Sequence, residues 1–382
     1  MIKRFLSTPH GIIFITSILS FSFWIFPDFG YLRKGFSERF DIFSFGFLLA
    51  MLWYLISILF SMAGFNLGKR IPIRTKKARK IVPVNSDSVY YIISFLTFIG
   101  VMKTFVTLFG LLGGVEIFFF NIFNGTANTF RHTLEEVYSP GIFSLRYLAI
   151  QASAVAVIRR LIFKKKSLLD YLNIMFLISI ALISSRLSII VFLLSTLILY
   201  LSYKRIRINM KKVLILGLSC FHLLGIFNYT RNINFYRDRG INDFYSAGFS
   251  EIMTYVGVAF QGAVSVGEKS YQILDDPQGW DNYAGIEKSL TANSALNSQF
   301  QLYGWWALVS TPILLLLLSF ITGILSRFRH TYLYLSYATL IYAFAEFWRL
   351  FWFGTGIMIT LTIMPIAIFL ILFLLKSARD NA

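Results

Sequence analysis

Apolar runs close to twenty residues long, separated by shorter polar segments, dominate this chain. Runs of this length suit helices that cross the hydrocarbon core of a bilayer. The alternation of apolar and polar residues that is typical of a membrane barrel does not occur, and only helices then satisfy the backbone at this depth. The pattern predicts an all-α polytopic membrane protein, with residues 1–382 as one integral membrane domain. The ten expected spans are 11–27, 42–67, 89–112, 141–163, 168–184, 187–203, 213–229, 302–325, 331–350 and 353–375.

Lysine and arginine divide unevenly between the two sides of these spans. One set of connections holds most of the basic residues, and Asp87, Asp170 and Asp380 are its only acids. The basic residues of this set lie at both termini and within residues 69–80, 159–166, 204–212 and 327–329. Cytoplasmic loops carry such an excess, so we expect both termini to be cytoplasmic.

Two stretches admit alternative interpretations. Residues 168–203 are either one long element or a tight hairpin. Both flanks are basic, which favours a hairpin that turns on the outer side at residues 184–186. Residues 252–266 are apolar but short, and a further span would place Arg327 outside. We therefore expect an interfacial or re-entrant helix there.

The outer side then carries two sizeable polar segments. Residues 113–140 form the smaller periplasmic loop, and residues 230–301 form a large periplasmic loop with short helices. The large loop is the longest polar stretch of a chain that is otherwise mostly membrane.

Composition agrees with this topology and excludes several functions. The chain is 57% hydrophobic and 14% charged, whereas soluble domains carry about 25% charged residues. The net charge of +18 follows from the topology and from attraction to anionic membrane lipids, so we expect no nucleic-acid partner. The four histidines are far apart, and Cys220 is the single cysteine. We therefore expect no metal site, although a site built from carboxylates alone stays open.

Several cations are predicted to lie at the outer leaflet, where topology does not require them. Ionisable groups in hydrocarbon cost roughly 2.5–3.5 kcal/mol, so they usually face a cavity or a partner. Together these cations would suit a phosphate or pyrophosphate at headgroup level. The alternatives are snorkelling for Lys103 and Arg146, an interfacial anchor for Arg186, and a helix-surface ion pair for Glu346 with Arg349. The set is Lys103, Arg131, Arg146, Arg186, Arg231, Arg237, Arg239 and Arg349.

Aromatic and acidic residues of the large loop add a second kind of candidate. Tyr236, Tyr245 and Trp280 could stack on sugars, whereas Trp305 and Trp306 are typical of an interfacial belt. An acid such as Asp243 could accept a proton from a sugar hydroxyl. The spacing alone does not choose among the acids of this loop.

The chain resembles the bacterial O-antigen polymerases, the Wzy family. Residues 184–190 read SSRLSII, a small-residue–Arg turn that enters an apolar span. Residues 228–231 read NYTR and lead from a span into the large outer loop. That loop returns through residues 293–297 and 302–306, a polar segment followed by a Tyr-Gly step. Related ligases often have histidine where Asn293 stands, which favours a polymerase over a ligase.

The resemblance implies a polymerase that joins undecaprenyl-pyrophosphate-linked oligosaccharide repeat units on the periplasmic face of the bacterial cytoplasmic (inner) membrane. It implies neither a metal nor another cofactor. The lipid-linked glycans are the substrates, membrane lipids surround the spans, and a chain-length regulator and a flippase are expected partners. The alternatives are another lipid-linked glycosyltransferase, acyltransferase or ligase, or a polysaccharide transporter or flippase. The expected catalytic residues are Arg186, Arg231, Arg237 and Asp243, and the expected substrate-binding residues are Lys103, Arg131, Arg146, Arg239, Tyr236, Tyr245, Asn293 and Arg349.

We predict that Arg186→Ala and Arg237→Ala each abolish chain extension while the protein still inserts into the membrane. Removal of one positioned charge donor costs on the order of 10²–10³ in rate. The length distribution of the lipid-linked product measures the effect. Normal polymerisation by both variants would contradict the role of these cations.

Overall fold

The structure is a computed structural model of the chain. It describes residues 7–25, 39–72, 81–123, 130, 133–134, 141–183, 187–204, 215, 218–219, 222, 237, 240–286 and 293–380. The chain divides into two compact units. Unit 1 comprises Met1–Leu67, Ile206–Ile321 and Phe344–Trp352, and unit 2 comprises Gly68–Arg205, Thr322–Ala343 and Phe353–Ala382.

The described residues are helical, and their only β-type pairing is an isolated bridge between Pro83 and Thr331. Among them, five helices are long and apolar enough to cross a membrane, and four shorter apolar helices accompany these. The chain is therefore an all-helical membrane protein. Helices coincide with nine of the ten expected spans, while most of residues 213–229 lie outside the described part.

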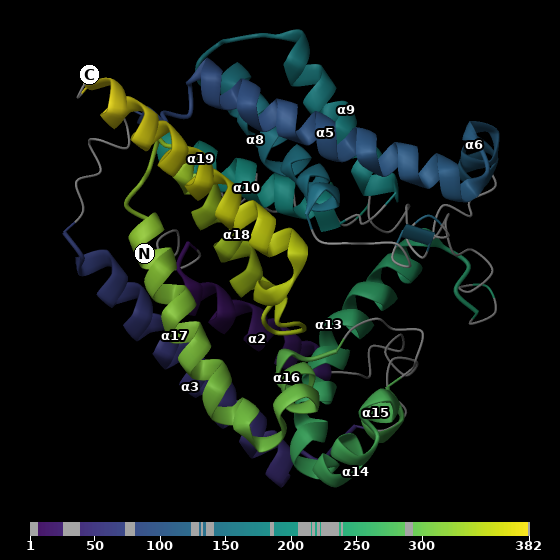
Figure 1. Cartoon of the computed structure of the whole chain (residues 1–382). Coiled ribbons are helices and arrows are strands. Elements are labelled where there is room, and N and C mark those ends of the chain that lie inside the picture. Colours follow the sequence, from purple (N-terminus) through teal and green to yellow (C-terminus); the bar gives the residue numbers. More distant parts are fainter. Residues whose placement is uncertain are drawn as a thin grey trace. The chain divides into compact units, whose positions relative to one another are not determined.

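Unit 1 is built around α13, which runs from Phe244 to Glu268 and packs along α2, Pro9–Ile25 (Figure 1). The Ser20 hydroxyl donates to the Val256 carbonyl at 2.7 Å, and the Trp24 indole N–H donates to Gln261 at 2.6 Å. The remaining helices of the unit are α3 (Phe45–Arg70), α14 (Ser270–Asp275), η3 (Pro277–Gly279), α15 (Trp280–Tyr283), α16 (Ala295–Tyr303), η4 (Gly304–Trp306) and α17 (Ala307–Leu325).

The length and burial of α13 differ from the expectation for this segment. We predicted short helices in the large outer loop and one apolar stretch at 252–266, whereas α13 is a single helix of 25 residues. The run from Val258 to Val264 is fully or almost fully buried. Its polar member Gln261 is satisfied by Trp24 and by the Ala284 carbonyl, so the helix can be buried despite its mixed composition.

Glycines let the helices of unit 1 approach closely. A Cβ on Gly64 of α3 would collide with the backbone carbonyl of Leu316 on α17, and a Cβ on Gly267 would collide with the backbone of Gly46. Small residues at such positions allow backbone contact between helices in membranes. The positions of these glycines therefore specify which faces of α3, α13 and α17 meet.

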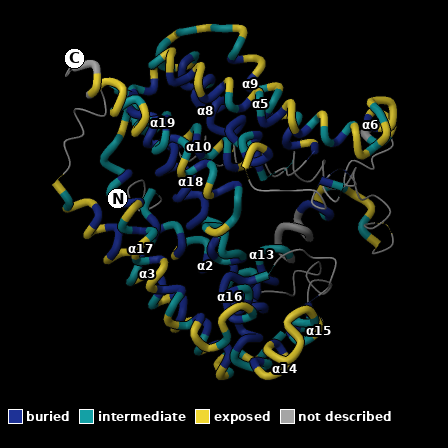
Figure 2. Tube along the Cα trace, in the orientation of Figure 1, coloured by how far each residue is buried: buried dark blue, intermediate teal, exposed yellow. Residues whose placement is uncertain are grey.

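Unit 2 is centred on α8, Leu148–Leu161, which is buried along most of its length (Figure 2). Around it pack α5, α9 and α10. The α9 and α10 helices contact each other, as the predicted hairpin requires. The other elements are α5 (Asp87–Leu112), α6 (Val115–Phe123), η2 (Ile142–Tyr147), α9 (Leu168–Ile183), α10 (Leu187–Tyr203), α18 (Leu333–Ala345), η5 (Trp352–Gly354) and α19 (Gly356–Asp380).

We predict that Gly64→Ala destabilises the protein, because the added methyl group meets the Leu316 carbonyl and forces α3 away from α17. Overpacking of this kind costs about 1–3 kcal/mol. Gly110→Ala is the matched control, since nothing lies within 4 Å of a Cβ at that helical position. Thermal unfolding in detergent should show a lower Tm for Gly64→Ala alone. Equal Tm values for the two variants would contradict the close contact.

Candidate functional site

A buried ion pair in unit 1 joins a predicted substrate-binding residue to an acid three residues before it, and a hydrogen bond links the same residue to α13. Arg349 lies in the turn that follows α18, and only 7% of its surface is exposed. Its Nε donates to the carboxylate of Glu346, and its Nη1 donates to the hydroxyl oxygen of Tyr255. The pair is therefore a buried ion pair linked to another helix, rather than the helix-surface pair that was the alternative.

Aromatic side chains surround this guanidinium group. Its central carbon lies 5.1 Å from the ring centre of Tyr255 and 5.9 Å from that of Trp348, within the range of cation–π attraction. The Tyr54 hydroxyl of α3 donates to the Trp348 carbonyl at 3.1 Å, and Phe347 stacks on Trp53 at 5.0 Å. The turn is thus held on both α3 and α13, which orients the cation.

The chemistry of this arrangement suits a phosphate group. A guanidinium has five N–H donors and can bind an anion through two of them at once. The bonds to Glu346 and Tyr255 orient Arg349 without using all five donors. In surroundings of low dielectric constant, such a preoriented cation acts on a nearby anion more strongly than it would in water.

A second polar group in unit 1 brings Asn293 together with Trp280. The Asn293 side-chain oxygen accepts from the backbone N–H of Ser294 at 2.7 Å and from the Asn297 amide at 2.9 Å. A Cβ placed on Gly262 of α13 would lie 3.5 Å from this oxygen and 3.6 Å from the Trp280 ring. The missing side chain at Gly262 therefore lets the amide and the indole approach the same point of α13.

The two groups lie on one face of α13. Tyr255 and Gly262 are seven residues apart, which is almost two full helical turns, or a rise of about 10 Å. One face thus carries a buried cation at one level and an amide with an indole at another. We define Tyr255, Glu346, Arg349, Trp280 and Asn293 as the α13 site.

Lys103 and Arg146 lie in unit 2, where α5 meets η2. Gly100 of α5 leaves room for the backbone of Arg146, and the Lys103 ammonium lies 5.6 Å from the Phe143 ring. Arg146 is buried, and its Nη2 donates to the Tyr147 hydroxyl at 3.0 Å. That burial excludes snorkelling for Arg146, whereas Lys103 is exposed.

Asp243, a predicted catalytic residue near the start of the large loop, lies at the N-terminus of α13. Asp243 caps α13 by accepting the Ser246 backbone N–H at 2.8 Å. Hydrogen bonds from the hydroxyl and backbone N–H of Ser246 hold the pKa of the Asp243 carboxyl below its usual range. A lowered pKa makes a carboxylate a weaker base, so the catalytic role of Asp243 stays a prediction without geometric support.

Tyr245 is half-exposed and makes an edge contact with His222, with ring centres 4.9 Å apart, and Arg237 is exposed. Neither is among the residues that the structure brings to the α13 site. The other predicted residues lie outside the described part of the chain: Arg131, Arg186, Arg231, Tyr236 and Arg239.

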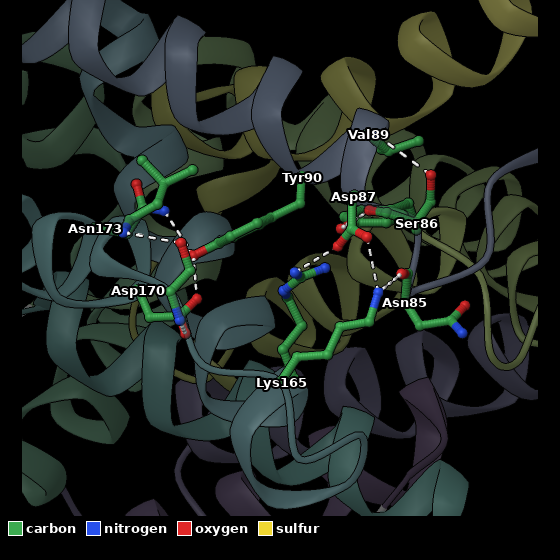
Figure 3. Close-up of polar contacts among 12 residues, drawn as sticks. Asn85, Ser86, Asp87, Val89, Tyr90, Lys165, Asp170 and Asn173 are labelled. Atoms are coloured by element: carbon green, nitrogen blue, oxygen red, sulfur yellow. Dashed lines mark hydrogen bonds and ion pairs between the residues drawn. The ribbon is translucent and has the colours of Figure 1, made fainter.

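Unit 2 contains a polar network that the sequence did not reveal (Figure 3). Asp87 accepts from Arg159 at 2.6 Å and from Lys165 at 2.8 Å, and Arg159 lies over the ring of Tyr90 at 4.4 Å. The Tyr90 hydroxyl donates to Asp170 at 2.8 Å. These contacts join the ends of α5, α8 and α9 that are expected to be cytoplasmic.

Asn173 extends this network by donating to Tyr90 and to Ser94 at 2.9 and 2.8 Å. The charges of the network balance, which is typical of a structural role. Its two cations are Arg159 and Lys165, and its two carboxylates are Asp87 and Asp170. The available signal was the rarity of acids among the basic connections, because Asp87 and Asp170 are two of the three. We assign this network to the scaffold.

Within the described residues, no group of three His, Cys, Asp or Glu side chains is placed to hold a metal ion. Comparisons of the chain with family models, with curated proteins and with solved structures found no match. The α13 site therefore has to be interpreted from its own geometry. Sequence reasoning identified Arg349, Asn293 and Trp280 but missed Tyr255, since nothing in its neighbourhood marks it.

We predict that Glu346→Gln lowers the stability of the protein by about 3 kcal/mol, because Arg349 then stays buried without its counter-ion. The double variant Glu346→Gln with Arg349→Met removes both charges and should recover most of the loss. Glu116→Gln, at an exposed position, is the control and should lower stability by only a few tenths of a kcal/mol. A double variant no more stable than Glu346→Gln would contradict the pairing.

Proposed function

We propose that this protein is a glycosyltransferase of the bacterial cytoplasmic membrane that polymerises undecaprenyl-pyrophosphate-linked oligosaccharide repeat units on the periplasmic face. The observation that carries the proposal is the buried Arg349 on the α13 face that also presents Trp280 and Asn293. A lipid-linked glycan carries an anionic pyrophosphate, which the Arg349 cation could bind, and an attached sugar, which the indole and the amide could contact.

The reaction forms one glycosidic bond and breaks one sugar–phosphate bond. A hydroxyl oxygen of the incoming repeat unit attacks the anomeric carbon of the growing chain. The bond from that carbon to the pyrophosphate oxygen breaks, and the lipid pyrophosphate leaves with the electron pair. A carboxylate of the large loop accepts the hydroxyl proton.

Arg349 would stabilise the charge that develops on the departing pyrophosphate. Donors that are oriented before the reaction need no reorganisation when the charge appears, which makes such stabilisation effective. Tyr255 and Glu346 would hold the guanidinium in its orientation. Arg186, Arg231 and Arg237 are further proposed catalytic cations, and Lys103, Arg131, Arg146 and Arg239 are proposed contacts to substrate phosphates, as the resemblance implies.

Asn293 and Trp280 would contact the glycan. An indole face stacks on the apolar side of a sugar ring, while an amide bonds to its hydroxyls. Tyr236 and Tyr245 are proposed as further contacts to the glycan. The wider assembly would include a flippase that delivers the substrate and a regulator of chain length.

Reconstitution with a lipid-linked repeat unit tests the proposal. The purified protein in liposomes should release polyprenyl pyrophosphate and form a ladder of longer lipid-linked glycans. Transfer to an acceptor other than a repeat unit would indicate a ligase or another transferase. Movement of the substrate across the bilayer without bond formation would indicate a flippase. Either result, or an unchanged substrate with folded protein, would overturn the proposal.

We predict that the double variant Arg349→Gln with Glu346→Gln reduces the rate of chain extension by about 10²–10³, because the oriented cation is lost while no unpaired charge remains. Arg160→Gln is the matched control. This partly exposed arginine bonds to the Tyr171 hydroxyl at 2.7 Å on the expected cytoplasmic side, and its loss should leave the rate unchanged. Equal rates for both variants would remove Arg349 from the mechanism.

A further inference from the structure

The short helix α6 exposes an unusual amount of apolar surface. Phe120 is 67% exposed and Phe119 is 50% exposed, and Val115 and Ile117 are also exposed. In a helix of nine residues, these side chains cover most of the circumference. Exposed apolar surface of this extent marks contact with a membrane or with another protein.

Phe118, which is buried, attaches α6 to the end of α5. Its ring stacks on Phe130 with ring centres 4.8 Å apart and makes an edge contact with Phe109 at 5.4 Å. Leu108 of α5 and Ile183 of α9 complete this cluster. The cluster accounts for one face of α6 and leaves its other faces without a protein partner among the described residues.

Two glycines end α5 abruptly and place α6 directly after it (Figure 1). Gly113 has a φ of 83° and Gly114 a φ of 147°, values that favour glycine. The N–H of Gly113 caps α5 by donating to the Phe109 carbonyl. Because α6 begins only two residues later, it lies at the depth at which α5 ends.

That depth follows from the length of α5. Its 26 residues span about 39 Å at 1.5 Å per residue. Asp87 at its first residue pairs with Lys165, so this end lies at the polar boundary of the membrane. A bilayer is about 30 Å thick in its hydrocarbon core and about 40–45 Å with its headgroups. The far end of α5 therefore reaches the opposite headgroup layer.

The exposed surface of α6 also continues a surface that faces lipid. Val106 of α5 is 68% exposed and Leu111 is 45% exposed, both on a helix long and apolar enough to span the membrane. The same kind of surface continues from Leu111 to Val115 across the glycine turn. Exposed apolar side chains thus lie on both sides of the glycine turn, at the end of α5 and at the start of α6.

We propose that α6 is a membrane-surface helix that binds phospholipid, with Phe119, Phe120, Val115 and Ile117 in the boundary between headgroups and acyl chains. Glu116 stands in the first turn of α6, where an acid is favourable at the helix N-terminus and can reach the headgroups. The Asn121 amide donates to the Ile117 carbonyl at 3.0 Å, which lowers the cost of this polar group near lipid. The polymerase proposal is not needed for this inference.

Part of residues 113–140, which we predicted as the smaller periplasmic loop, would also lie at headgroup level. Phe130 and Leu134 pack in the same cluster as Phe118, so α6 would hold them at headgroup level too. If the polymerase proposal is correct, this is the layer in which a lipid-linked pyrophosphate lies.

Spin labelling at introduced cysteines tests the inference. Cys220 is the single cysteine of the chain, so its replacement by serine removes background labelling. A label on Phe120→Cys is measured in liposomes of phosphatidylethanolamine and phosphatidylglycerol, with oxygen and a water-soluble nickel chelate as collision partners. Val106→Cys serves as the lipid-facing control and Lys166→Cys as the water-facing control. All three positions are exposed, so we expect the variants to keep the Tm of the parent.

We expect the ratio of oxygen to nickel collisions at position 120 to be severalfold above that at position 166 and below that at position 106. A ratio equal to that of position 166 would place α6 in water and overturn the proposal. Low collision rates with both reagents would mean that protein covers α6, either a partner or a second copy, and would also overturn it. Glycan polymerisation does not enter this measurement, so its outcome is independent of the proposed function.

Discussion

The pairing of charges inside apolar surroundings is the constraint on which this structure depends. An isolated charge in the interior of a helical membrane protein is costly, so each buried cation needs hydrogen-bonding partners. The buried Arg159 pairs with the half-exposed Asp87, 72 residues away, and the buried Arg349, which pairs with Glu346, also donates to the Tyr255 hydroxyl, 94 residues away. Contacts over such separations join helices that the apolar runs alone would not align. The pairing in unit 2 stabilises three helices at one end, and the pairing in unit 1 orients a cation beside α13.

The α13 helix shows how far apolar pattern predicts the fold and where it stops. Long apolar runs predicted nine of the described helices, because hydrocarbon thickness sets their length and composition. The same criterion underestimated α13, whose polar and glycine residues resemble those of a loop. Gln261 can lie in the buried face of α13 because it accepts a hydrogen bond from Trp24 and donates one to the Ala284 carbonyl. Propensity and hydropathy contain no information on such distant partners.

The candidate site was predictable to a similar degree. Arg349 was found because a charge near the outer end of a span is costly and therefore informative. Asn293 was found through the resemblance, since it stands where related ligases often have histidine. Tyr255 was missed because its contact with Arg349 depends on tertiary structure. Asp243 was selected as an acid in a polar loop; the structure shows it as the N-cap of α13, and its catalytic role stays a prediction. The geometry of unit 1 holds one cation in a fixed orientation, and under the proposed function this cation would stabilise a lipid-linked anion.

The central claim is that the segment from α13 to α16 lies on the outer side of the membrane, opposite the basic connections. Side-specific labelling measures this directly. Tyr271 of α14 is 86% exposed, and Lys166 lies in the basic connection between α8 and α9. In a Cys220→Ser background, a membrane-impermeant maleimide added to intact cells should modify Tyr271→Cys at once and Lys166→Cys only after permeabilisation. Labelling of both positions from the same side, or of position 271 only after permeabilisation, would contradict the account.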